Sequence, residues 1–322
     1  MSSTRHIVYP DAEENLSKLI TGERLARLEA MGRFAIYYGR PSRPEELIER
    51  IGDASAVVSG WGMSNDVLRA TKNVQIISFT GFGVGTFIDV EEAARLGITV
   101  THTLSTAETI AEHTMALMLA AARNITRLDR ETRTGGWNTE LPGFDLRGKT
   151  LGLIGFGRIA QQVVPLAQAF GMRVIAWTRN PDAERVTRFG IEFTDIDNML
   201  TESDVLSLHL PFTPETEGLL TAERLRNTKP GVVIVNTARA RILDESAMIE
   251  LLASGHIAAA GLDVFSEEPL PPGHPLTTLD NVALTPHCGY NTPEANAALI
   301  DIAIDNLEAF FDGNPTNVAT PS

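Results

Sequence analysis

The sequence is short of cysteine and of positive charge, and each shortage excludes a class of protein. Its one cysteine, Cys288, cannot form a disulfide within the chain and is typical of a reducing compartment. Lysine and arginine number 27 against 41 aspartate and glutamate, which gives a formal net charge of −14. Nucleic acids and anionic membranes attract basic surfaces, so neither is expected as a partner.

Long hydrophobic runs are absent as well. The most apolar helical window, residues 114–122, is too short to cross a bilayer. The first ten residues lack the apolar core of a signal peptide. These observations predict a cytoplasmic protein without membrane contact.

The 322 residues, 43% hydrophobic and 21% charged, are enough for two globular domains. Short apolar runs alternate with helical patterns along the whole chain, which is typical of parallel sheets in α/β proteins. A first series of strands is expected at His6–Tyr9, Phe34–Tyr38, Ala56–Ser59, Gln75–Phe79 and Ile98–Thr101. A second series is expected at Thr150–Ile154, Arg173–Trp177, Val205–Leu208, Val232–Asn236, Ala258–Asp263 and Val282–Thr285, the six strands of a full dinucleotide-binding sheet.

Two helical segments indicate how the domains connect. Ala107–Arg133 is predicted as one long helix between the two strand series, and Pro293–Phe311 follows the last strand with an apolar stripe. The simplest topology returns this last helix to the N-terminal domain. We therefore predict an α/β fold of two Rossmann-like or flavodoxin-like domains with parallel sheets. The substrate-binding domain is discontinuous, 1–103 with 288–322, and the dinucleotide-binding Rossmann domain is 104–287.

A glycine fingerprint lies near the middle of the chain. Gly155 and Gly157 follow an apolar strand and precede a helical stretch, Gln161–Phe170, with Ala160 as the third member of the G-x-G-x-x-A pattern. Such a turn places backbone amides and a helix N-terminus where a pyrophosphate binds, although any tight strand-to-helix turn can use glycines. Gly155, Gly157, Arg158 and Ile159 are the expected pyrophosphate-binding residues.

The end of the next strand bears on cofactor choice. NAD-selective sites usually have an acidic residue here that binds the ribose 2′-OH, and this chain has Thr178 followed by Arg179. A hydroxyl and a guanidinium can bind a 2′-phosphate that a carboxylate would repel. NADP(H) is therefore favoured and NAD(H) remains possible. The alternative is that Arg179 is a solvated loop residue.

Three chemically suited side chains follow the late strands. Arg239 comes directly after a central strand, where it could instead pair with Asp244 or Glu245, and Glu268 and His287 follow the last two strands. A histidine at a strand end is more often structural than catalytic when considered alone. Reduction of a 2-oxo acid, however, needs a cation for the carboxylate, a proton donor, and a carboxylate that favours the protonated imidazole.

Several motifs in this order resemble the D-isomer-specific 2-hydroxyacid dehydrogenase family over nearly the whole chain. They are the fingerprint Gly155–Ala160, Asn236–Arg239, Gly261–Phe265 with Glu268-Pro269, Thr285–His287, Ala111–His113 and Leu208–Pro211. The resemblance implies that Arg239 binds the substrate carboxylate and carbonyl, His287 is the general acid–base, and Glu268 orients it. It also implies that Asp263 faces the nicotinamide carboxamide, while the cofactor is lined by Leu210, Pro211, Thr237 and Ala238.

The N-terminal domain carries a second glycine loop, Gly81–Gly85, that resembles the loop whose amides hold the substrate carboxylate in this family. Gly81, Gly83 and Val84 are the residues implied to bind substrate, although three glycines after a strand can also form a plain turn. The sequence departs from the family pattern in two places. The loop lies one residue farther from Ile88-Asp89 than is usual, and Ala240 stands where glycine is usual.

The resemblance predicts reversible hydride transfer between NAD(P)H and a small 2-oxo acid, with glyoxylate and hydroxypyruvate as the first substrates to test and no metal ion. Alternatives are a 3-phosphoglycerate dehydrogenase-like enzyme without a regulatory domain and a non-catalytic dinucleotide-sensing regulator. A formate dehydrogenase would have glutamine in place of Glu268. A homodimer through the nucleotide-binding domain is also expected, because the long helix has small and apolar residues at 111, 115, 118 and 122.

Overall fold

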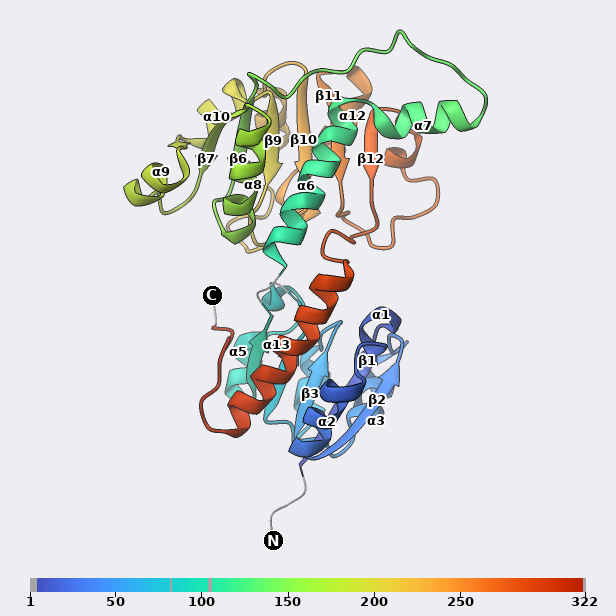
Figure 1. The fold of residues 1–322 in the computed structure, drawn as a ribbon, viewed down its shortest axis with the longest axis vertical. Helices are drawn as coiled ribbons and strands as arrows, with labels where there is room; N and C mark the ends of the chain where they lie inside the picture. The colour runs from blue at the N-terminus through green and yellow to red at the C-terminus, as the bar shows by residue number, and fades with distance from the viewer. Residues whose placement is uncertain (1–4, 82, 104–105, 321–322) are drawn as a thin grey trace. The chain divides into compact units, whose positions relative to one another are not determined.

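The computed structural model describes residues 5–81, 83–103 and 106–320, and it divides into two compact units (Figure 1). Unit 1 is Met1–Thr106 with Asn291–Ser322, and unit 2 is Ala107–Tyr290. The divisions at 106/107 and 290/291 each fall three residues beyond the predicted boundaries at 103/104 and 287/288. The predicted start of the nucleotide-binding domain, residue 104, lies outside the described residues.

The sheet of unit 1 is parallel, and its strand order among the described residues is β2-β1-β3-β4-β5. This is the flavodoxin-like order, whose topological switch point lies between the first and third strands. The strands are β1 (His6–Ala12), β2 (Arg33–Tyr38), β3 (Ala56–Ser59), β4 (Ile76–Phe79) and β5 (Thr99–His102). The five strands predicted for this half of the chain are therefore confirmed, with ends displaced by a few residues.

Helices cover both faces of this sheet because the strand residues alternate between two cores. Val8 faces one core and its neighbours Ile7 and Tyr9 face the other. The first core packs on α3 (Pro44–Ile51), α4 (Asn65–Ala70) and α5 (Val90–Arg95). The second packs on α1 (Glu14–Ser17), α2 (Gly22–Met31) and α13 (Pro293–Phe311).

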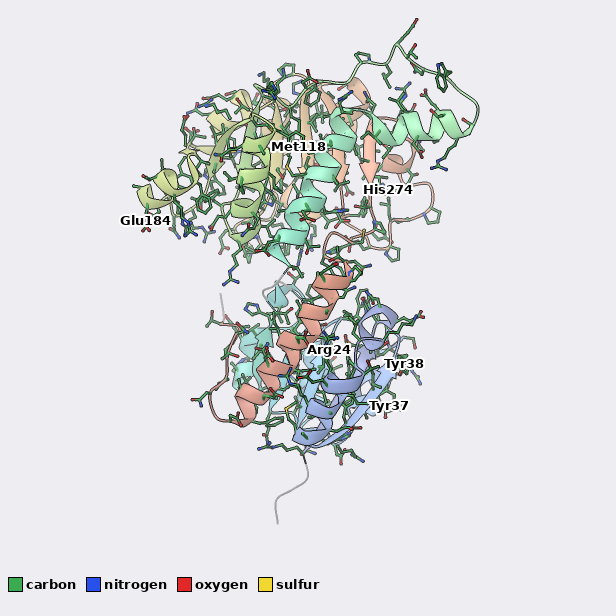
Figure 2. The ribbon with its side chains drawn as sticks, in the orientation of Figure 1. Arg24, Tyr37, Tyr38, Met118, Glu184 and His274 are labelled. Atoms are coloured by element: carbon green, nitrogen blue, oxygen red, sulfur yellow. The ribbon has the colours of Figure 1, made fainter. Side chains whose placement is uncertain are left out.

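The last helix, α13, belongs to unit 1, as the discontinuous fold predicted. Thr292 caps its first turn by accepting a hydrogen bond from the Ala295 amide, and a proline at the first position is preset for a helix. The Ser78 hydroxyl of β4 donates to the Ala303 carbonyl at 3.1 Å. Arg24 of α2, labelled in Figure 2, donates two hydrogen bonds to the Asp301 carboxylate. Residues far apart in the sequence thus complete one core.

Unit 2 contains a second parallel sheet with the order β12-β11-β10-β9-β6-β7-β8 among the described residues. Read from the other edge, this is the 3-2-1-4-5-6 order of a dinucleotide-binding sheet with one strand added. The strands are β6 (Thr150–Ile154), β7 (Arg173–Trp177), β8 (Glu192–Phe193), β9 (Val205–Leu208), β10 (Val232–Asn236), β11 (Ile257–Leu262) and β12 (Val282–Leu284). The predicted six strands are present, but the short edge strand β8 was missed.

The predicted single helix over residues 107–133 is wrong. The structure has α6 (Ala107–Ala122) and α7 (Ile125–Arg133), separated by Asn124 with φ of 52°, in the left-handed region that asparagine tolerates. The Phe144 amide donates to the Ala122 carbonyl at 3.0 Å, and Gly143 passes so close that a Cβ there would lie 2.7 Å from that carbonyl oxygen. A later segment of the chain therefore crosses α6 at its end.

The core of unit 2 has two layers. One face of the sheet packs on α6 and on α8 (Arg158–Ala169), which begins three residues earlier than the predicted helix. The other face packs on α10 (Ile196–Glu202), α11 (Ala222–Arg226) and α12 (Glu245–Ser254), and α9 (Ala183–Phe189) follows β7. Short 3₁₀ turns lie at Val84–Thr86, Ala240–Ile242 and Pro275–Thr278.

The residues expected to form a dimer surface on α6 are buried in this core. Ala111, Met115, Met118 and Ala122 are at most 5% exposed, and Met118 is labelled in Figure 2. The expectation that they face a partner is therefore wrong, because α6 packs on α8 and on β10 and β11 of its own unit. Among the described residues, no helix is long and apolar enough to cross a membrane.

Candidate active site

The glycine turn between β6 and α8 has the geometry of a phosphate cradle. Gly155 has φ of 97°, and a Cβ there would lie 2.7 Å from the His209 carbonyl oxygen, so only glycine fits. Gly157 is the N-cap of α8, is exposed, and has nothing within 4 Å of where a Cβ would stand. As a glycine, Gly157 has no side chain with which to cap the first turn of α8. The turn and helix end therefore fit the pyrophosphate of a dinucleotide.

The residues that would contact the 2′ position of the ribose lie beside this turn. The Gly155 amide donates to the Trp177 carbonyl at 2.9 Å, which places Thr178 next to the glycines. The Arg179 side chain is 66% exposed, and its Nη2 lies 4.0 Å from a carboxylate oxygen of Glu215. A hydrogen bond from the Thr213 hydroxyl is the main reason why the pKa of Glu215 lies below its usual value, and the charge of Arg179 adds a small contribution in the same direction. Arg179 thus has an anionic neighbour that the sequence did not indicate.

The other residues implied to line the cofactor follow β9 and β10. Leu210 and Pro211 come after β9, and a Cβ at Gly155 would lie 2.8 Å from the Leu210 Cδ2 atom. The Thr237 hydroxyl lies 2.9 Å from the hydroxyl of Thr114 on α6, which fixes the turn after β10 against that helix. Since the carboxyl ends of parallel strands meet at one edge, these residues share that edge with the glycine turn.

Arg239 is held by a side chain at the end of β10. Asn236, 1% exposed, accepts a hydrogen bond from the Ala238 amide and donates one to the Arg239 carbonyl, at 2.9 and 3.0 Å. The Arg239 Nη1 donates to the Ala238 carbonyl at 2.7 Å. Burial lowers the pKa of the guanidinium, and the charge of Glu268 opposes that shift. A partly buried cation at the edge of the sheet suits a small carboxylate ligand.

Glu268 and His287 are brought together from the segments that follow β11 and β12. The Nδ1 atom of His287 lies 2.7 Å from Oε2 of Glu268, and the other oxygen of Glu268 accepts a hydrogen bond from the Phe265 amide. Burial alone would raise the pKa of Glu268, but hydrogen bonds from His287 and Phe265 and the charges of His287 and Arg239 lower it. An ionised carboxylate therefore holds Nδ1 and leaves Nε2 as the ring nitrogen directed elsewhere.

Asp263 is placed differently from the other predicted site residues. The residue is 2% exposed, and its carboxylate oxygens accept hydrogen bonds from Thr285, Cys288 and Gly289. No sequence pattern indicated these contacts. His113 of α6 also belongs to this cluster, since its Nε2 lies 3.0 Å from the Thr285 hydroxyl across 172 positions of sequence. Both residues stood in recognised motifs, but no local pattern could have shown that they touch.

The predicted substrate loop lies in unit 1, after β4. Gly83 has φ of 68°, Val84 is buried, and the Thr103 amide donates to the Gly81 carbonyl at 3.3 Å. Phe82, within this loop, lies outside the described residues. The loop therefore stands at the carboxyl edge of its sheet, where an open α/β fold binds ligands.

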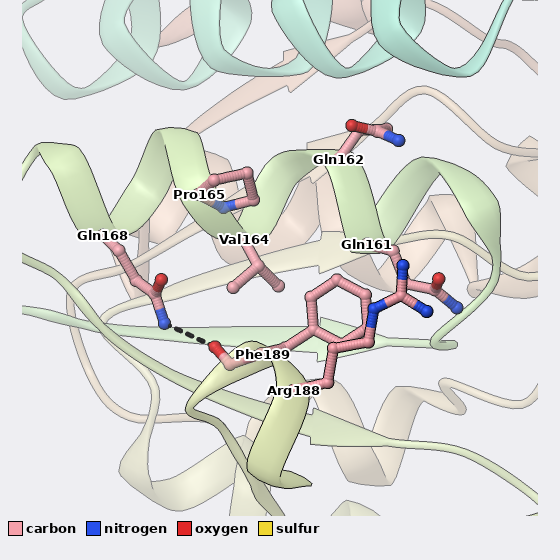
Figure 3. A pocket seen from close by; sticks show the side chains of 7 residues that line it. All are labelled: Gln161, Gln162, Val164, Pro165, Gln168, Arg188 and Phe189. Atoms are coloured by element: carbon pink, nitrogen blue, oxygen red, sulfur yellow. Dashed lines mark hydrogen bonds between the residues drawn. The ribbon is translucent and has the colours of Figure 1, made fainter. Parts of the chain in front are cut away.

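A pocket elsewhere in unit 2 contains none of the predicted site residues. It lies between α8 and α9, and Figure 3 shows its lining by Gln161, Gln162, Val164, Pro165, Gln168, Arg188 and Phe189. The Gln168 amide donates to the Phe189 carbonyl at 2.8 Å and so joins the two helices across it. The pocket is thus separate from the constellation at the edge of the sheet.

Comparison with known proteins adds independent findings. Residues 115–289 match the family model for the NAD-binding domain of D-isomer-specific 2-hydroxyacid dehydrogenases. A glyoxylate reductase from Aeropyrum pernix is 38% identical, over 97% of this chain and 93% of that protein. A D-3-phosphoglycerate dehydrogenase from Methanocaldococcus jannaschii is 40% identical, over 89% of this chain but 55% of that protein.

A solved structure shows the same similarity at the level of the fold. An NADPH-dependent glyoxylate/hydroxypyruvate reductase from Sinorhizobium meliloti, in complex with NADP and malonate, has a TM-score of 0.86 to this chain and is 28% identical to it. The superposition covers 99% of this chain and 97% of that one.

Proposed function

Because the chain belongs to the D-isomer-specific 2-hydroxyacid dehydrogenase family, we propose that it reduces glyoxylate and hydroxypyruvate to the corresponding 2-hydroxy acids. The protein is an NAD(P)-dependent oxidoreductase of the α/β class. The observation that supports the proposal is that Arg239, Glu268 and His287 lie in the segments that follow three adjacent strands, β10, β11 and β12. A cation, a carboxylate and an imidazole at one edge supply the groups that reduction of a 2-oxo acid requires.

In this mechanism, Arg239 binds the substrate carboxylate through its planar guanidinium and orients the adjacent carbonyl. His287 donates a proton from Nε2 to the carbonyl oxygen as the carbonyl carbon is reduced. Glu268 accepts the hydrogen bond of Nδ1 and stabilises the imidazolium that provides this proton. In the reverse direction, His287 removes the proton of the 2-hydroxyl group.

The remaining residues hold the cofactor and the substrate. A bound nicotinamide dinucleotide supplies the hydride. The amides of Gly157, Arg158 and Ile159 at the N-terminus of α8 would hold its pyrophosphate, because Gly157 has no side chain that would block its approach. The amides of Gly81, Gly83 and Val84 in unit 1 bind the substrate carboxylate. Unit 1 is then the substrate-binding domain and unit 2 the dinucleotide-binding domain.

The proposal is tested by the oxidation of NADPH and NADH with glyoxylate, hydroxypyruvate, pyruvate and 3-phosphohydroxypyruvate. We expect turnover of glyoxylate and hydroxypyruvate. His287→Gln should lower kcat by about 10²–10⁴-fold, the usual contribution of a general acid, with cofactor affinity nearly unchanged. A His287→Gln variant within a few-fold of the parent would remove His287 from the chemistry.

A second candidate is supported by the 40% identity to D-3-phosphoglycerate dehydrogenase, although the chain spans about half of that relative. Preference for 3-phosphohydroxypyruvate over hydroxypyruvate in the same assay would favour it. Cofactor binding without turnover of any 2-oxo acid would instead favour the non-catalytic regulator. Glu268, where a formate dehydrogenase has glutamine, opposes that activity.

We further propose that NADPH is used in preference to NADH, because Thr178 leaves no repulsive charge at the 2′ position and Arg179 can bind a phosphate there. A charged hydrogen bond from Arg179 to the 2′-phosphate should favour NADPH by about tenfold in kcat/KM, because solvent screening weakens this bond at an exposed side chain. Thr178→Asp should reverse it by adding a ribose partner and a repulsive charge.

Glu215→Gln is the informative companion variant, since it removes the carboxylate 4.0 Å from Arg179 and should increase the preference for NADPH. Equal use of both cofactors by the parent, or an unchanged ratio in Arg179→Ala, would show that the 2′ position is not recognised.

A further inference from the structure

A single buried carboxylate contacts the chain on both sides of His287. Oδ1 of Asp263 accepts hydrogen bonds from the Thr285 hydroxyl at 2.5 Å and from the Cys288 amide at 3.0 Å. Oδ2 accepts one from the Gly289 amide at 2.9 Å. The end of β11 is thereby joined to the residues just before and just after the proposed proton donor.

The backbone at His287 explains why such a clamp is needed. Its φ of 53° lies in the left-handed region, which few residues other than glycine adopt, although histidine, asparagine and aspartate adopt it more often than most. In this conformation Nδ1 of His287 reaches Glu268 at 2.7 Å. The amides of the two following residues, Cys288 and Gly289, donate hydrogen bonds to Asp263, and these bonds oppose relaxation of the backbone toward an ordinary conformation.

Hydrogen bonds connect this cluster to α6, and their donors and acceptors can be assigned. Burial would raise the pKa of Asp263, but hydrogen bonds from His113, Thr285 and the two amides lower it, so the carboxylate is ionised and only accepts. The Thr285 hydroxyl therefore donates to Asp263, and its oxygen accepts from Nε2 of His113 at 3.0 Å. His113 thus anchors the clamp to a helix in the core of unit 2.

The packing around these groups is tight. A Cβ at Gly289 would lie 3.0 Å from Oδ2 of Asp263 and 3.1 Å from Cδ2 of His113. The possible ligand atoms of His113, Asp263 and Cys288 lie within 4.8 Å of one another, as in a metal site. Both oxygens of Asp263 are, however, already occupied by hydrogen-bond donors, which favours a structural clamp over a metal centre.

We propose that Asp263, Thr285 and His113 are positioning residues that hold His287 in the left-handed conformation in which its imidazole meets Glu268. The inference rests on the proposed function for its effect on catalysis. The positioning itself is a property of unit 2 and can be measured without turnover.

The charged and titratable groups that bear on His287 come from several elements. They are Glu268, Arg239, Asp263, Cys288 and His113. Thr285 is not among them, so its substitution changes the clamp without adding or removing a charge. Thr285→Val is therefore the cleanest probe, and Thr285→Ser, which keeps the hydroxyl, is its conservative counterpart.

A matched control lies in the same unit. The Thr126 hydroxyl of α7 donates to the Val282 carbonyl of β12 at 3.2 Å, so Thr126→Val also removes one threonine hydrogen bond near β12. The readout is the titration of His287 in protein labelled with ¹⁵N-histidine, where its signal is identified by its loss in His287→Gln. Glu268→Gln defines the titration of an imidazole without its carboxylate partner.

We expect the titration midpoint of His287 in Thr285→Val to move toward that of Glu268→Gln by about half a pH unit, since the contact with the carboxylate loosens. Thr285→Ser and Thr126→Val should titrate like the parent. In an active enzyme, Thr285→Val should lower kcat about ten- to hundredfold with KM and cofactor affinity nearly constant, the effect of a misplaced catalytic group.

An unchanged His287 titration in a folded Thr285→Val protein would overturn the proposal. If that variant does not fold, His113→Leu, at a partly exposed position on α6, takes its place, with the donor-retaining His113→Gln as its counterpart. The proposal would also be overturned if Asp263→Asn weakened cofactor binding but left the titration of His287 unchanged. Absence of turnover by the parent would contradict the proposed function alone, because the titration remains measurable.

Discussion

Glu268 places a negative charge in direct contact with His287, so the pH dependence of reduction depends on both residues. Reduction requires a protonated imidazole, which the adjacent carboxylate favours. The pKa of Glu268 is held below its usual value of 4.5, so its charge persists over the range in which activity is measured. A depressed carboxyl pKa also adds stability above pH 4.5 that is lost as the pH falls through the lower, folded-state pKa.

Glu268→Gln should therefore move the alkaline limb of the kcat profile for 2-oxo acid reduction to lower pH by about one unit, since the imidazole loses the charge that favours its protonated form. The measurement is kcat from pH 5 to 9 under saturating cofactor. The variant should also lack the contribution that ionised Glu268 makes to stability above pH 4.5. A profile that coincides with that of the parent would contradict the assigned role of Glu268.

Only a few residue types can act as the cation, the carboxylate and the proton donor of such a reaction. Arg239, Glu268 and His287 could therefore be proposed from the sequence. A cation, a carboxylate and an imidazole after successive strands are recognisable because parallel strands end at one edge. The contacts of Asp263 could not be predicted, because its partners lie on α6 and beyond β12. Glu215 beside Arg179 was unpredictable for the same reason, since no periodicity connects the two loops.

At the scale of elements, α13 shows how one late helix supports an early sheet. Ile304 is 1% exposed and packs in the core that includes Ile7, Ile76 and Leu28. Together with α1 and α2, this helix covers one face of the sheet in unit 1, so removing side-chain volume here leaves a cavity among strands and helices of distant sequence.

Ile304→Ala should destabilise unit 1 by about 2–5 kcal/mol, the range for large-to-small substitutions in cores. Hydrogen exchange should increase in peptides from β1 and β4, while peptides from β9 and β10 of unit 2 exchange as in the parent. Ile302→Ala, at a half-buried position on the same helix, is the matched control and should have a smaller effect. Equal loss of protection from hydrogen exchange in the two variants would contradict the expectation that the buried position of Ile304 causes the destabilisation.

Strands with strong β-branched patterns could be predicted almost to the residue, as β3, β7 and β10 illustrate. The edge strand β8 could not, because two residues carry no period. The break between α6 and α7 was hidden for a different reason. Its cause is the crossing of residues 142–144, a tertiary contact that the helical pattern of the segment does not contain.

At the scale of the whole molecule, the two most exposed large apolar side chains of unit 2 lie on α7 and on the segment after it. Trp137 is 84% exposed and Ile125 is 51% exposed, and residues 134–149 connect α7 to β6 without helix or strand (Figure 1). Exposed large apolar side chains in unit 2 are consistent with the homodimer that we propose for the nucleotide-binding domain, through a surface other than α6.

Sedimentation of the parent at micromolar concentration should then give the mass of a dimer, and Trp137→Glu should shift the population toward monomer because a charge would be buried at the contact. Tyr38→Glu is the control, since Tyr38 is also an exposed aromatic, at 68%, but lies in unit 1. A monomeric parent would exclude this assembly.

The discontinuity of unit 1 determines the order in which the protein can fold as it emerges from the ribosome. Ile7, Tyr9 and Ile76 are made early, but α13, which covers them, begins only at Pro293. Synthesis proceeds at about 5–20 residues per second, so unit 2 can complete its sheet while the first sheet has only α1 and α2 on the face that α13 later joins. The first domain of the nascent chain is therefore the last to close, and part of its apolar core stays accessible to chaperones throughout the translation of unit 2.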